Sequence, residues 1–168
     1  MIKKILSGTL ILASIGLLAG YFYFNKSVSG QVPNLTIHSL KGEQIDLAHL
    51  KGSPALITFW STDCSGCIKE IPHLKALHES YRQTGFKIIA IAMHYDRLEH
   101  VTSMVKAKQL PYTVSFDASA QAAKAFGNVR LTPTSFLIDS EGYIVMQKIG
   151  EFDTALVRKK IEALLEAS

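Results

Sequence analysis

Two cysteines are the residues of this chain whose type and spacing could do chemistry. Cys64 and Cys67 are the only cysteines in the sequence, and they follow the apolar run Ala55–Trp60 in a C-x-x-C arrangement. Two thiols held this close can form and open a disulfide with little backbone movement. A disulfide that closes so short a loop stabilises a fold by only about 2 kcal/mol. The pair therefore indicates thiol–disulfide chemistry rather than a structural crosslink.

A zinc site is a second interpretation of the same pair, and the sequence disfavours it. A structural zinc site takes four ligands, and the chain has no second C-x-x-C. His73 and His78 lie downstream, but they fall on the body of the helix that is expected after the cysteines. We therefore expect no metal at Cys64 and Cys67.

The elements that must position the cysteines are a buried strand before them and a helix after them. Apolar residues recur at spacings of three and four between residues 65 and 83, which predicts a helix that Gly85 ends. Strands are predicted at residues 35–40, 43–47, 55–60, 87–93, 112–116, 134–139 and 143–149, and further helices at 97–108, 119–126 and 154–167. This order predicts an α/β fold with a central mixed β-sheet flanked by helices, preceded by an N-terminal β-hairpin.

Residues 5–24 form a charge-free segment that is long enough to cross a bilayer as a single helix. Lys3 and Lys4 precede it, Lys26 follows it, and the aromatic residues 21–24 lie where a membrane interface would be. A cleaved signal peptide is the alternative, although no A-x-A cleavage site ends the segment. Under either interpretation the rest of the chain is exported, so we expect it on the extracytoplasmic side of the membrane.

The chain is expected to consist of a membrane anchor at residues 1–26, a polar linker at 27–34 and one domain at 35–168. Its net charge of +4 is modest. The basic triplet Arg158-Lys159-Lys160 falls within the last predicted helix, where a solvated face accounts for it. We therefore expect no binding to nucleic acid.

Several motifs accompany the cysteine pair. They are Phe59-Trp60 before it, Pro72 after it, Thr132-Pro133-Thr134 before a strand, and Phe136-Leu137-Ile138-Asp139 followed by Glu141-Gly142. With these motifs, residues 31–168 resemble the thioredoxin superfamily, and within it the membrane-anchored TlpA/ResA/CcmG-like thiol–disulfide oxidoreductases of bacteria. The resemblance implies a thioredoxin-like fold on the outer side of the bacterial cytoplasmic membrane. It implies a reductase of disulfides in exported proteins, with apocytochrome c as one candidate substrate, a transmembrane electron donor and no cofactor.

The resemblance also implies a role for each matching residue. Cys64 matches the nucleophile, at a helix N-terminus that favours the thiolate, and Cys67 matches the resolving cysteine. Pro133 matches the family's cis-proline, which with its neighbour Thr132 faces the pair. Glu70 matches a buried acid whose raised pKa would let it exchange a proton with Cys67, although a solvated surface glutamate is the alternative.

Trp60 carries two interpretations, a wall beneath the active site or plain core at a strand end. Three positions depart from the family pattern: Asp63 replaces a common tryptophan, Ser65-Gly66 lacks a common proline, and Thr58 replaces the buried aspartate of thioredoxin. The Asp63 carboxylate would oppose thiolate formation at the next residue, or it would cap the helix. We therefore expect the pKa of the nucleophilic thiol to lie nearer neutrality than the acidic range, and the couple to be reducing.

Two other functions stay open on the same fold. A Cu(I)-binding module would use both cysteines and a distant histidine, for which His94 and His100 are candidates, although related copper-binding domains have C-x-x-x-C spacing. A thiol peroxidase would have a Pro-x-x-x-Thr-x-x-Cys pattern, but Ile57 and Ser61 occupy its proline and threonine positions.

Overall fold

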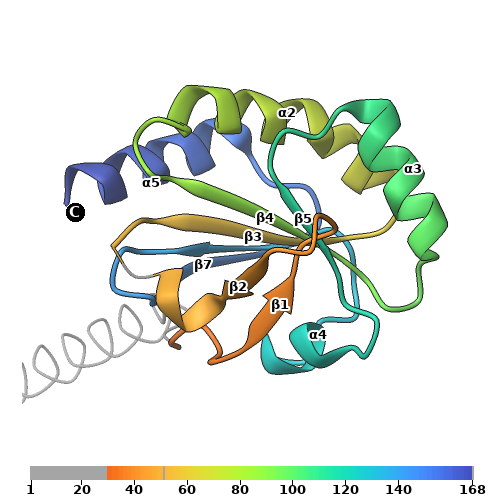
Figure 1. Cartoon of the computed structure of the whole chain (residues 1–168). Coiled ribbons are helices and arrows are strands. Elements are labelled where there is room, and N and C mark those ends of the chain that lie inside the picture. The colour runs from red at the N-terminus through yellow and green to blue at the C-terminus, as the bar shows by residue number, and fades with distance from the viewer. Residues whose placement is uncertain (1–29, 51, 168) are drawn as a thin grey trace, which may run out of the picture.

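A five-stranded mixed β-sheet forms the centre of the protein (Figure 1). The computed structural model describes residues 30–50 and 52–167. The strands lie in the order β5-β4-β3-β6-β7, with bounds β3 Ala55–Trp60, β4 Lys87–Ala92, β5 Thr113–Phe116, β6 Thr134–Ile138 and β7 Ile144–Ile149. β3 runs parallel to β4 and antiparallel to β6, while β4 and β5 are parallel and β6 and β7 antiparallel. The predicted mixed sheet is confirmed.

The central strand β3 is the apolar run that precedes the cysteines. All six of its residues are buried, because the strand pairs on both edges and is covered on both faces, the arrangement that yields an unbroken apolar stretch. Its register places Trp60 opposite Ala92 of β4 and Phe59 opposite Thr134 of β6. The end of β3 and the start of β6 therefore lie at the same edge of the sheet.

Two layers cover the sheet (Figure 1). One face carries the helices α2 (Ser65–Tyr81), α3 (Leu98–Lys108) and α5 (Thr154–Glu166), and the other carries β1 (Thr36–His38), β2 (Gln44–Asp46), the 3₁₀ helix η1 (Leu47–Leu50) and α4 (Gln121–Ala125). Alternate residues of β3 supply the two apolar cores, as the pleat of a strand requires. Leu56 and Trp60 pack toward α2, whereas Ile57 and Phe59 pack toward the hairpin side.

The predicted N-terminal hairpin is present, with β1 and β2 paired antiparallel. The helix after the cysteines also follows the prediction, with Pro72 inside it and the positive-φ Gly85 (φ +86°) shortly after its end. A side chain at Gly85 would place its Cβ 2.9 Å from Ser53 Oγ. The backbone angle therefore favours glycine, and any other residue would also force the Ser53 hydroxyl to move.

The fourth helix is shorter than the predicted span of residues 119–126, because α4 covers Gln121–Ala125. Ala120 has φ +58°, in the left-handed region, so the helix cannot include it. The carboxylate of Asp117 accepts hydrogen bonds from Ala122 N at 3.0 Å and Ala123 N at 2.8 Å. This buried aspartate takes over the role of an N-cap from a position four residues before the helix.

The anchor predicted at residues 1–26, with its apolar segment 5–24, lies outside the described residues, as do residues 27–29 of the predicted linker. Within residues 30–50 and 52–167, no helix is both long and apolar enough to cross a membrane. The membrane helix therefore stays a prediction from the sequence.

Candidate active site

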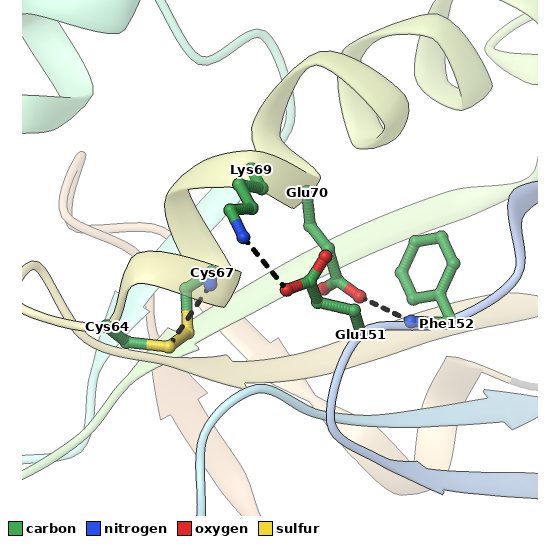
Figure 2. A network of polar contacts seen from close by, with 6 residues as sticks. All are labelled: Cys64, Cys67, Lys69, Glu70, Glu151 and Phe152. Carbon is green, nitrogen blue, oxygen red and sulfur yellow. Dashed lines mark hydrogen bonds and ion pairs between the residues drawn. A yellow bond between two sulfur atoms is a disulfide. The ribbon is translucent and has the colours of Figure 1, made fainter.

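The cysteine pair lies where the central strand gives way to α2. Cys64 is the N-cap residue of α2, and the structure holds it in a disulfide with Cys67, with their Cα atoms 5.2 Å apart (Figure 2). Cys64 is half-buried, whereas Cys67 is only 3% exposed. A reaction partner therefore reaches Cys64 first, which fits the order of attack that the sequence predicts.

The first turn of α2 presents backbone N–H groups to Cys64. Cys67 N donates to Cys64 Sγ at 3.1 Å, and Ile68 N donates to the carbonyl oxygen of Cys64, also at 3.1 Å. An N–H group aimed at the sulfur and the positive end of the helix dipole both favour negative charge there. The same arrangement would stabilise the Cys64 thiolate once the disulfide is reduced.

Two side-chain contacts hold the loop between β3 and α2. Asp63 Oδ1 accepts a hydrogen bond from Ser61 Oγ at 2.6 Å. Asp96 accepts hydrogen bonds from Thr62 N at 2.6 Å and Thr62 Oγ1 at 2.9 Å. The alternative that Asp63 caps α2 is wrong, because the sulfur of Cys64 takes the capping position one residue later. The Asp63 side chain remains exposed beside the nucleophile.

The Thr132–Pro133 peptide bond is cis, as predicted. Because the register of the sheet pairs Phe59 with Thr134, Pro133 lies at the edge of the sheet where the cysteines lie. Thr132 and Pro133 line one open groove of about 510 Å³ together with Cys64. The structure therefore brings together the nucleophile and the cis-proline that the sequence separates widely.

Glu151, which follows β7, lies against Gly66, the second of the two residues between the cysteines. A Cβ atom at Gly66 would lie 3.2 Å from Glu151 Oε1 and 3.4 Å from Pro133 Cδ. A larger residue at this position would therefore need the Glu151 side chain to shift slightly. On the next turn of α2, Lys69 Nζ lies 3.8 Å from Glu151 Oε1.

Glu70 is a buried carboxyl behind the cysteine pair. Its side chain is 3% exposed, and Glu70 Oε1 accepts a hydrogen bond from Phe152 N at 2.7 Å (Figure 2). Burial raises the pKa of Glu70 to about 7, the hydrogen bond from Phe152 lowers it, and the negative charge of Glu151 raises it. The predicted burial of Glu70 is confirmed, so the alternative of a solvated surface glutamate is wrong. Its proton exchange with Cys67 stays a prediction.

Glu70, Cys67 and Trp60 line the same small cavity on the α2 side of the sheet. Trp60 is 4% exposed, and its Nε1 has no hydrogen-bond partner among the described residues. Both interpretations of Trp60 hold, because the same ring belongs to the apolar core and borders the resolving cysteine.

Thr58 and Tyr112 form the polar remainder of this cavity. Thr58 is uncharged, and its Oγ1 accepts a hydrogen bond from Ser135 Oγ at 3.0 Å. The pKa of Tyr112 is raised by burial and by the charge of Glu70. Among the described residues that line the cavity, Glu70 is the one with a carboxyl group.

Glu151, Tyr112 and Tyr95 are site residues that sequence reasoning missed. Tyr112 reads as an ordinary strand residue, and Glu151 reads as a polar residue in a loop. For Glu151, the sequence contains one indication: the glycine at position 66 allows another residue to approach the cysteine loop closely. Nothing in the sequence says which residue that neighbour is.

The sequence profile of the family described as Redoxin matches residues 27–165 of the chain. The chain belongs to the Redoxin family. It is 33% identical over 155 residues to the thiol-disulfide oxidoreductase ResA of Bacillus cereus, covering 90% of this chain and 86% of that protein. It is 27% identical over 146 residues to the ResA of Bacillus subtilis, covering 82% and 80% of the two chains.

The crystal structure of a thiol:disulfide interchange protein of the thioredoxin family from Chlorobium tepidum is similar in fold. It superposes with a TM-score of 0.74 at 25% identity, covering 83% of this chain and 99% of that one. This Redoxin family member therefore has the thioredoxin-like fold and the ResA-like relationship that its motifs predict, and it is a thiol–disulfide oxidoreductase with the C-x-x-C pair Cys64 and Cys67.

The two histidine candidates for the copper alternative lie on other parts of the surface than the groove of Cys64. His94 lines a separate groove beside Tyr95, and His100 is exposed on α3. Neither histidine lines the groove that contains Cys64. Across the part of the chain that the structure describes, no three His, Cys, Asp or Glu side chains gather as metal ligands.

Proposed function

We propose that this Redoxin family member is a membrane-anchored, extracytoplasmic reductase of disulfides in exported proteins. One observation carries the proposal: the half-buried Cys64 opens into a groove beside the cis-Pro133, while the buried Cys67 has the titratable Glu70 behind it. A nucleophile open to a protein substrate and a resolving thiol served by an acid are the two parts that disulfide reduction needs.

The first step is the attack of the Cys64 thiolate on a substrate disulfide. A bond forms between Cys64 Sγ and one substrate sulfur, the substrate S–S bond breaks, and the other sulfur leaves as a thiolate that takes a proton from water. The substrate lies extended in the groove beside Thr132 and Pro133. The product of this step is a mixed disulfide.

The second step releases the substrate. The Cys67 thiol passes its proton to the Glu70 carboxylate and attacks Cys64 Sγ, the mixed disulfide breaks, and the second substrate sulfur leaves as a thiolate and is protonated. Two electrons have then passed from the Cys64–Cys67 dithiol to the substrate. A pKa of about 7 for Glu70 leaves both of its protonation states populated at neutral pH, so it can take up the proton and later release it.

The proposed substrates and partners follow from the resemblance to ResA-like proteins and from the N-terminal sequence. Exported proteins with oxidised cysteines, apocytochrome c among them, are the proposed substrate class. The oxidised pair must be reduced again outside the cytoplasm, so a transmembrane electron donor with its own thiols is the proposed partner. Residues 5–24 are the proposed anchor.

The test is a trapping experiment with the reduced full-length chain in mild detergent and a disulfide-containing protein. Cys67→Ser should accumulate a mixed disulfide through Cys64, because it lacks the thiol that resolves it, and Cys64→Ser should form none. Neither variant should turn over, whereas the wild type should reduce the substrate. Substrate reduction by Cys64→Ser at the wild-type rate would contradict the proposal.

A further inference from the structure

The groove into which Cys64 opens is acidic. Among the described residues that line it, Asp63 and Glu151 are the charged ones, and none is Lys, Arg or His. The remaining lining residues are small, polar or apolar: Ser61, Ser65, Gly66, Tyr95, Thr132, Pro133 and Gly150. A substrate segment that brings its disulfide to Cys64 therefore meets negative charge on the groove wall.

The two carboxylates come from different elements and flank the nucleophile. Asp63 is exposed and directly precedes Cys64, and its Oδ1 is held by Ser61 Oγ at 2.6 Å. Glu151 follows β7, and its Oε1 lies 3.2 Å from where a Cβ atom of residue 66 would lie. The substrate residues that adjoin the reacting cysteine must therefore pass close to both groups.

Glu151 has a weak ion-pair partner, Lys69, so its carboxylate can still bind a substrate cation. Lys69 Nζ lies 3.8 Å away, and the two side chains are 69% and 51% exposed. An ion pair this long and this exposed contributes little, because both groups remain hydrated. A substrate cation can therefore replace or share Lys69 at small cost.

The chemistry of the exchange adds a reason for a basic partner. During attack, the negative charge of the thiolate spreads over three sulfurs, and Asp63 and Glu151 place two further negative charges nearby. A cation on the substrate offsets this repulsion, whereas an anion adds to it.

We infer that the preferred substrates are polypeptides with a lysine or arginine next to the reacting cysteine, and that Asp63 and Glu151 bind this cation. The inference rests on the proposed reductase function and names its substrate class. Because the groove is open to solvent, the effect acts mainly on the encounter between enzyme and substrate, and salt screens it.

The test uses three disulfide-bonded peptides that differ only in the residue beside the cysteine, which is Lys, Gln or Glu. The reduced full-length chain should reduce the Lys peptide about 10-fold faster than the Glu peptide, in kcat/KM, at about 0.01 M salt. The Gln peptide should fall between them, and the difference should largely vanish at about 1 M salt.

The double variant Asp63→Asn, Glu151→Gln should lose the preference. The readout is the ratio of rates for two peptides, so any change in the reactivity of Cys64 cancels. Glu141→Gln, an exposed acid in the β6–β7 turn, is the matched control and should keep the wild-type ratio.

Three results would overturn the inference. Equal rates for all three peptides would refute it and leave the reductase function standing. A preference that persists in the double variant would assign the recognition to other groups. Reduction of none of the peptides would contradict the proposed function itself, and the inference with it.

Discussion

Replacing Glu70 by glutamine should change how the stability of the fold depends on pH. In the unfolded chain this carboxyl ionises near its ordinary pKa of 4.5, whereas in the folded protein burial raises the pKa to about 7. Between these values the folded state binds the proton and the unfolded state does not. Folding is therefore favoured by Glu70 protonation at pH 4.5 and below, and this contribution is lost as the pH rises to about 7.

The magnitude follows from the same two pKa values. At roughly 1.4 kcal/mol for each pH unit, ionising Glu70 across this interval costs the folded state at most about 3 kcal/mol. Glutamine cannot ionise, and its side-chain oxygen can still accept the hydrogen bond from Phe152 N. Glu70→Gln should therefore match the wild type near pH 4.5 and exceed it by up to about 3 kcal/mol at pH 8.

The assay is denaturant unfolding of the oxidised proteins over a pH series, with Glu141→Gln as an exposed control that should follow the wild type. The free energy of unfolding of the variant minus that of the wild type is the quantity of interest, because other titrating groups cancel in it. A difference that stays constant between pH 4.5 and pH 8 would refute the buried-acid account of Glu70.

Further predictions concern the loop, the nucleophile and the proton step. Asp63→Asn should lower the pKa of the Cys64 thiol, because it removes an adjacent negative charge; ultraviolet absorbance of the thiolate measures this, and an unchanged titration would exclude Asp63 as the tuning group. Asp96→Ala should destabilise the fold by roughly 1–3 kcal/mol, since Thr62 N and Oγ1 lose their acceptor, and an unchanged melting temperature would contradict this role. Asp117→Ala should cost about 1–2 kcal/mol through loss of the α4 cap, with Asp117→Asn, which keeps one acceptor oxygen, losing less in the same melting experiment. Glu70→Gln should also flatten the pH profile of substrate reduction near pH 7, and a profile like that of the wild type would remove Glu70 from the proton step.

The parts of the fold that the sequence predicts well are those whose signal is local. β3 is predicted to the residue, because a strand covered on both faces is an uninterrupted apolar run. The boundaries of α4 are not, because its cap comes from Asp117, outside the helix, and its start is set by the left-handed Ala120. Neither the cap from Asp117 nor the left-handed backbone at Ala120 produces a periodic pattern of apolar residues in the sequence.

The candidate site divides in the same way. Cys64, Cys67 and Pro133 are found from short motifs, and Glu70 from its place one turn after the second cysteine. Glu151 enters the site only through tertiary packing, because the turn after β7 carries it back over Gly66. The capping alternative for Asp63 failed by one residue, since a sequence does not show which of two adjacent polar residues begins a helix.

The reduction potential of the Cys64–Cys67 couple tests the central claim most directly. It can be measured by equilibrating the full-length chain in detergent with thiol–disulfide buffers and quantifying the fraction of the pair that is oxidised. A reductase should give a value near about −270 mV, as thioredoxin does. A value near about −120 mV, typical of a strong oxidant, would contradict the proposed direction of electron flow.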